Sequence, residues 1–146
     1  MSERGLNMVL RHVMVHLSCL YEPGPELHSM GRYRIVDSYS AQSFGNAGVT
    51  LESEVLRISV DLDRSHIGYT LMSTDEQERD VEPTIDIVVR LLTGDPGYDW
   101  ETERFAAFIC ENLDEIEALF APENLPATKA EVERLQWIRA KELFGI

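Results

Sequence analysis

Carboxylates gathered in one third of the chain are the side chains best placed to do chemistry. The 146 residues include 26 acidic and 13 basic side chains, a net charge of −13. Residues 74–123 alone hold 15 acidic and 3 basic side chains, a net charge of −12. Such a density of one charge attracts a cationic partner over long range and speeds their encounter. It also repels nucleic-acid backbones and anionic membranes, so we predict neither as a direct partner.

Two aromatic residues, Tyr98 and Trp100, lie inside this acidic segment. Aromatic side chains surrounded by charge are typical of binding hot spots. We therefore predict a partner-binding surface formed by both aromatic residues and by the carboxylates Asp75, Glu76, Glu78, Asp95, Asp99, Glu101 and Glu103. An ordinary solvated acidic face is the alternative interpretation. For Trp100, the alternative is packing at the start of a helix that Asp99 caps.

His12, His16 and Cys19 have the spacing i, i+4 and i+7, which places them on one stripe of a helix. Such a stripe can ligate a metal, but the residues between the two histidines are apolar and cannot activate water. We favour a stripe packed at the edge of the core with hydrogen-bonded ring nitrogens. The sequence has no phosphate-binding glycine motif and no calcium loop. We therefore predict no catalytic residue, metal or cofactor.

The two cysteines, Cys19 and Cys110, are far apart in the sequence and show no zinc-binding spacing. A disulfide framework and a structural zinc site both lack support from this pattern. We expect both cysteines to be reduced, buried thiols.

The apolar periodicity predicts the elements that position these residues. A helix is expected over 6–21, followed by four antiparallel strands near 33–39, 49–51, 56–62 and 67–71. Three helices follow: one with Pro83 in its first turn, one that runs to Pro122, and one opened by a capping box from Thr128 to Glu131. This order predicts a single α+β domain over 1–146, with helices packed on one face of the sheet.

The run Phe44-Gly45-Asn46, with residues 49–53, Leu56-Arg57-Ile58 and Asp63-Arg64, resembles the middle of small uncharacterised bacterial proteins. Some of these are regarded as immunity proteins of polymorphic toxin systems. The resemblance covers about a third of the chain and carries no catalytic signature. It implies a small acidic protein that neutralises a toxin by covering its site. The long helical C-terminal half departs from that pattern.

We therefore expect a non-enzymatic binding protein that occludes a basic partner, such as a nuclease toxin. A nucleic-acid mimic that fills a basic groove is a variant of this hypothesis. The chain shows no signal peptide and no apolar run long enough to cross a membrane, so we predict a cytoplasmic location.

Two other classes of function stay open. One is a small metal-dependent enzyme that uses His12, His16 and Cys19, or the acidic cluster. The other is a subunit of a larger assembly, including a homodimer, because the chain ends on the apolar residues Leu143, Phe144 and Ile146.

Overall fold

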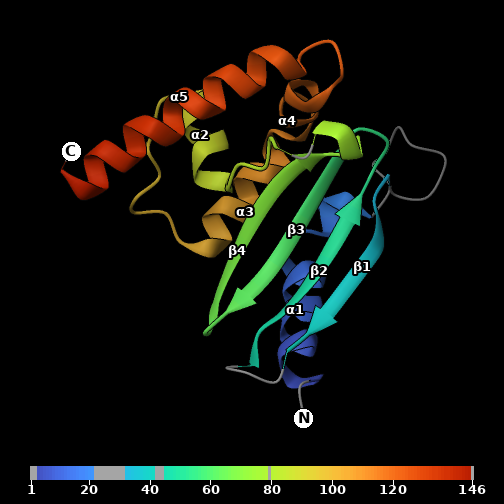
Figure 1. Cartoon of the computed structure of the whole chain (residues 1–146). Helices are drawn as coiled ribbons and strands as arrows, with labels where there is room; N and C mark the ends of the chain where they lie inside the picture. The colour runs from blue at the N-terminus through green and yellow to red at the C-terminus, as the bar shows by residue number, and fades with distance from the viewer. Residues whose placement is uncertain (1–2, 22–31, 42–44, 79, 146) are drawn as a thin grey trace.

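The computed structural model describes residues 3–21, 32–41, 45–78 and 80–145, and it confirms the predicted α+β architecture. Helix α1 (Glu3–His16) precedes a four-stranded sheet, and the C-terminal half is helical (Figure 1). The strands are β1 (Arg34–Ser40), β2 (Ala47–Glu52), β3 (Leu56–Asp63) and β4 (His66–Ser73). The later helices are α2 (Ile85–Thr93), α3 (Thr102–Glu111), α4 (Leu113–Phe120) and α5 (Leu125–Phe144). Short 3-10 helices η1 (Ser18–Leu20) and η3 (Glu76–Glu78) lie before and after the sheet.

The sheet is antiparallel throughout, in the order β1-β2-β3-β4. β3 pairs with β4 over its full length, from Leu56 opposite Ser73 to Asp63 opposite His66. The two-residue turn between these strands places Arg64 at φ 52° and Ser65 at φ 73°. Positive φ at both turn residues matches the right-handed twist of the paired strands. This tight hairpin fixes the start of β4, the strand beside which the candidate site lies.

One face of the sheet forms the core. Every second residue of β3, from Leu56 to Leu62, is buried, and these side chains share the core with Val9 and Val13 of α1. Figure 1 shows α1 behind the sheet. α2 contacts both β4 and α5. The helices of the C-terminal half therefore approach the sheet from the β4 side.

The long helix predicted to run to Pro122 is divided into α3 and α4 at Asn112. This residue leaves the helical region, with φ −123° and ψ 25°. Its side-chain amide donates a hydrogen bond to the Phe108 carbonyl at 3.0 Å, a local bond that competes with helix continuation. The apolar periodicity continues across the break, which is why the sequence alone predicts one helix.

Several predicted helix ends are wrong. α5 begins at Leu125, so Thr128 lies inside the helix and its hydroxyl donates to the Leu119 carbonyl at 2.6 Å instead of capping. α1 ends at His16 rather than near residue 21, and η1 follows it. α2 begins at Ile85, after Pro83, whose carbonyl accepts a hydrogen bond from the backbone of β4 at 2.9 Å. Pairing with the sheet edge thus overrides the helix-starting preference of proline.

The expectation of two reduced thiols is also wrong for this structure, because Cys19 and Cys110 form a disulfide. Their Cα atoms are 5.7 Å apart although 91 positions separate them in the chain. Cys19 lies in η1 and Cys110 in the last turn of α3, and these segments meet because α1 packs against α3. The spacing of cysteines along the sequence can indicate a short metal-binding motif, but it cannot predict a contact between distant segments. Within the described ranges, every helix is too short or too polar to cross a lipid bilayer.

Candidate partner-binding groove

A groove of about 520 Å³ lies along β4, between the β3–β4 hairpin, the loop before α3 and the middle of α5. We name it the β4 groove. It is lined by Asp61, Asp63, His66, Ile67, Gly68, Tyr69, Thr70, Thr84, Ile85, Asp86, Gly97, Tyr98, Trp100, Phe105 and Arg139. Its floor is largely aliphatic, aromatic or glycine, and its carboxylates come from β3 and α2. This composition suits a ligand that has both apolar and cationic groups.

The loop before α3 is shaped by Asp95 and Gly97. A carboxylate oxygen of Asp95 accepts a hydrogen bond from the Gly97 amide at 2.8 Å, which closes an Asx turn. Gly97 is buried with φ 73°, and a Cβ atom there would lie 3.4 Å from the Phe105 ring. That distance is an ordinary contact, so the positive φ rather than lack of space is what favours glycine at this turn.

Trp100 forms the aromatic wall of the groove. It directly precedes Glu101, the N-cap residue of α3, and its ring centroid lies 5.3 Å from that of Phe105. This is a hydrophobic staple, so the predicted packing of Trp100 at a helix start is confirmed. Asp99 was the wrong cap, because α3 begins after Glu101. The Arg104 guanidinium lies 3.9 Å from the centroid of the Trp100 ring, a cation–π contact that further fixes the indole.

Tyr98 is held at the rim by its hydroxyl. That hydroxyl donates to a carboxylate oxygen of Glu142 at 2.7 Å, and Arg90 makes bonds of 2.9 and 2.8 Å to the same carboxylate. The hydrogen bonds from Arg90 and then Tyr98 lower the pKa of Glu142 to about 2. The carboxylate in turn raises the pKa of Tyr98. About half of the Tyr98 side chain stays exposed, so its ring is available to a partner.

The charge of the β4 groove is negative. Arg139 is the only lysine or arginine among its described lining residues, and it donates to Asp86 at 2.5 Å. Asp61 accepts hydrogen bonds from the Tyr39 and Ser59 hydroxyls at 3.0 and 2.9 Å. Since Arg139 is matched by Asp86, the carboxylates of Asp61 and Asp63 leave an excess of negative charge at the β3 side.

Tyr69 connects the floor of the groove to the core. Its hydroxyl donates to the Thr102 carbonyl at 3.2 Å and lies 2.5 Å from Nε2 of His12. When the hydroxyl donates to Thr102, the second bond requires the His12 tautomer that carries its proton on Nε2. Burial, and then the nearby His16, lower the pKa of His12, which favours this neutral ring. The Tyr69 hydroxyl thus links His12 of α1 to Thr102, the first residue of α3.

The predicted site residues form two groups at opposite ends of β4. Asp95, Tyr98, Asp99, Trp100, Glu101 and Glu103 lie at the start of β4, where the Thr102 hydroxyl donates to the Ile67 carbonyl at 3.0 Å. We call these the groove group. Asp75, Glu76 and Glu78 follow the other end of the strand, where the Asp75 amide donates to the Ser73 hydroxyl. We call these the loop group. The seven residues from Ile67 to Ser73 span about 20 Å in a strand.

No carboxylate of either group forms an ion pair with a cation in the described part of the chain. Other acidic residues of the segment do. Asp80 pairs with Lys129, Asp86 with Arg139, and Asp114 and Glu117 with Arg32. Among the described residues, the ion pairs thus leave out the predicted carboxylates.

The histidine and cysteine stripe does not present three free ligands. Cys19 is bonded to Cys110, and His12 is hydrogen-bonded to Tyr69. The rings of His12 and His16 lie 4.7 Å apart between centroids. The described residues contain no group of three His, Cys, Asp or Glu side chains arranged to hold a metal ion.

Sequence reasoning missed the charged and histidine side chains that line the β4 groove: Asp61, Asp63, His66, Asp86 and Arg139. The first two alternate on the outer side of β3, and this pattern already marked them as solvent-facing. Their nearness to Trp100 depends on strand order and on the docking of α5, which no local pattern reports. Arg139 lies on α5 and is nearly forty positions from Trp100 in the chain.

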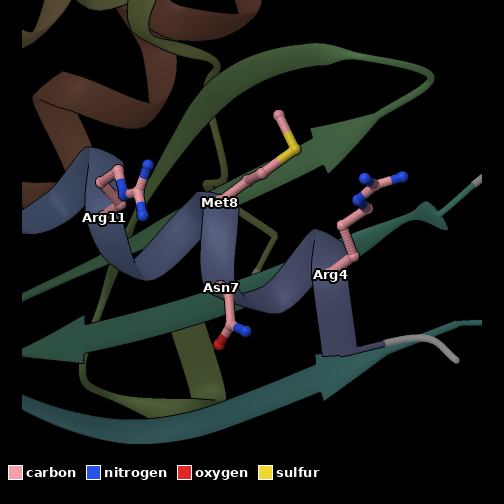
Figure 2. A pocket seen from close by; sticks show the side chains of 4 residues that line it. All are labelled: Arg4, Asn7, Met8 and Arg11. Atoms are coloured by element: carbon pink, nitrogen blue, oxygen red, sulfur yellow. The ribbon is translucent and has the colours of Figure 1, made fainter.

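A second hollow, of about 460 Å³, lies on the exposed face of α1 and is lined by Arg4, Asn7, Met8 and Arg11. Figure 2 shows these side chains spreading outward from one helix, with the two guanidinium groups well apart. Because the polar groups do not converge on one point, this hollow lacks the arrangement of a ligand site.

No protein-family model, curated protein or solved structure matches the chain.

Proposed function

We propose that this protein is a non-enzymatic acidic binding protein that occludes a basic protein partner, such as a nuclease toxin. The resemblance to bacterial immunity proteins is part of the same proposal. The observation that carries it is the β4 groove, which combines an apolar floor, a fixed aromatic wall and two carboxylates, Asp61 and Asp63, that form no ion pair with another described residue. A basic residue of the partner would place its aliphatic stem on the floor and its charge beside Asp61 and Asp63.

Occlusion by such a surface has two separable steps. The negative field of residues 74–123 accelerates the encounter with a cationic surface, which appears in the association rate. Burial of Tyr98 and Trp100 against the partner then slows dissociation, because desolvated aromatic anchors contribute most of the binding free energy. No chemical step is needed in this mechanism.

Affinity capture from lysate of the source cells tests the proposal. Three immobilised proteins are compared: the wild type, Tyr98→Ala with Asp63→Asn, and Met14→Ala. Met14 is 66% exposed on α1 and serves as the matched control. We expect a basic protein to be retained in stoichiometric amount by the wild type and by the control, and to be lost by the groove variant. Equal retention by all three proteins, or capture of acidic proteins only, contradicts the proposal.

The redox state of the Cys19–Cys110 pair in cells tests the proposed cytoplasmic location. Disulfides persist in oxidising compartments and are rare in the reducing cytosol. Rapid alkylation in intact cells, followed by mass spectrometry, measures the redox state of Cys19 and Cys110. Two alkylated thiols support the cytoplasm, whereas a fully formed disulfide contradicts it.

A further inference from the structure

The outer face of α5 carries an exposed stripe with the spacing of a helix-pairing seam. Its members follow at intervals of four and three residues: Ala130, Arg134, Trp137, Lys141 and Phe144. Residues at these intervals lie on one side of a helix. The opposite side of α5 is in the core, through Val132 and Leu135. We call the exposed set the α5 stripe.

The α5 stripe exposes the largest apolar side chains of the described surface. Trp137 is 59% exposed and Phe144 is 76% exposed. Figure 1 shows α5 along the outside of the helical layer, with its C-terminal end extending past α2. Large exposed aromatic residues on one helix face are typical of protein–protein contacts.

We propose that the α5 stripe pairs with the α5 stripe of a second copy of this chain, as two antiparallel helices related by a two-fold axis. The geometry points to one alignment, or register, of the two helices, in which Trp137 of one copy faces Trp137 of the other. In that register the small side chain of Ala130 faces the large side chain of Phe144 in the second copy. Small and large residues then interdigitate at both ends of the contact.

The same register matches charges. It places Glu133 opposite Lys141 of the second copy, and the two-fold axis repeats this contact at the other end. Both side chains are exposed, and neither forms an ion pair with another described residue; within its own chain Lys141 makes a cation–π contact, with Nζ 5.8 Å from the centroid of the Trp137 ring. The pairing therefore supplies each with a partner of opposite charge.

The overall charge also favours α5 over other surfaces for contact between two copies. Residues 124–146 carry 3 acidic and 4 basic side chains, whereas the whole chain has a net charge of −13. Two identical acidic surfaces repel each other, so like copies approach best through the region that is not acidic. The pairing is independent of the proposed function, since the α5 stripe shares no residue with the β4 groove.

The mass in solution, measured by light scattering over a concentration series, tests the pairing. We expect the wild type to reach twice the chain mass of 16.6 kDa as concentration rises. Lys141→Glu brings carboxylates together at both ends of the contact and should weaken dimerisation by about tenfold or more. Arg11→Glu makes the same charge change on an exposed residue of α1 and should leave the dimer intact.

The double variant Glu133→Lys with Lys141→Glu exchanges the two charges and should restore the dimer. Thermal melting of each variant separates a lost contact from a lost fold, because Lys141 also lies in the last turn of α5. A wild-type monomer at the highest concentration overturns the proposal. A dimer that Lys141→Glu leaves unchanged, or that the charge exchange does not restore in a folded protein, also overturns it.

Discussion

The two ends of β4 carry the same kind of charge in different surroundings. The loop group of Asp75, Glu76 and Glu78 follows the end of the strand. It lies in and before η3, a short helix that contains no buried residue. The groove group includes Trp100 and the half-exposed Tyr98, which line the β4 groove, and its carboxylates lie next to these two residues in the chain without lining the groove. The carboxylates of both groups form no ion pair with any residue that the structure describes, so charge alone does not distinguish the groups.

What distinguishes them is apolar surface that a partner can cover. A carboxylate in water gains little from an exposed ion pair, because solvent and salt screen it. The same carboxylate beside a desolvated aromatic contact acts in a drier environment and also fixes the orientation of the partner. We therefore expect both groups to contribute to encounter, and only the groove group to contribute to residence time.

The largest effect is expected from the disulfide, which holds the far end of α3 and no part of the loop group. Replacing Cys19 and Cys110 by serine should lower the free energy of unfolding by about 2–4 kcal/mol, because the unfolded chain regains conformational entropy. Denaturant titration measures this change. Hydrogen exchange should show faster opening at α3 than at residues 75–78. Equally faster hydrogen exchange at α3 and at residues 75–78 would contradict the expected difference between the two ends of β4.

Loss of the aromatic wall should have the next largest effect. Trp100→Ala should weaken binding to the identified partner by about 2 kcal/mol, close to thirtyfold in Kd, mainly through faster dissociation. Surface plasmon resonance gives both rate constants. Trp100 also staples α3, so a melting curve and the Tyr98→Ala variant accompany the measurement. If both variants are folded and dissociate from the partner at the wild-type rate, Tyr98 and Trp100 are not part of the interface.

Charge reversal compares the two groups directly. Glu101→Lys with Glu103→Lys should slow association at low salt by about tenfold, and the effect should shrink as salt is added. Glu76→Lys with Glu78→Lys makes the same change of net charge at the loop group. It should slow association less and leave dissociation unchanged. Equal effects of the two pairs on both rates would mean that only net charge matters.

The smallest effect concerns the pH dependence of stability through His12. Burial, then His16, lower its pKa below the ordinary value of 6.5. As pH falls below 6.5 the unfolded chain takes up a proton that the folded chain does not, so the free energy of unfolding decreases. His12→Gln should flatten this decrease below pH 6.5 relative to the wild type. Parallel stability curves for the two proteins would show that His12 is not the group responsible.

The elements of the fold were largely predictable from the sequence because their signals are local. The alternation from Leu56 to Leu62 predicted β3, and the three- and four-residue spacing predicted the helices. Trp100 was predictable as a staple because N′ and N4 are close along the chain. The ends of helices were less predictable. Pro83 pairs with β4 and Thr128 bonds back to α4, and such tertiary bonds leave no local pattern.

The candidate site was predictable in its chemistry but not in its geometry. The sequence identified Tyr98, Trp100 and the carboxylates of the groove group as neighbours, since they are close along the chain. It could not separate the loop group from them, because an eight-residue strand lies between the two groups in space. It also missed the disulfide and Arg139, whose partners are distant in sequence.

Hydrogen exchange on the complex with the captured partner tests the central claim most directly. Partner binding at the β4 groove should slow exchange at residues 66–70 and 95–105 while exchange at residues 75–78 stays as in the free protein. Protection confined to residues 75–78, or absent from both ends of β4, would contradict the account.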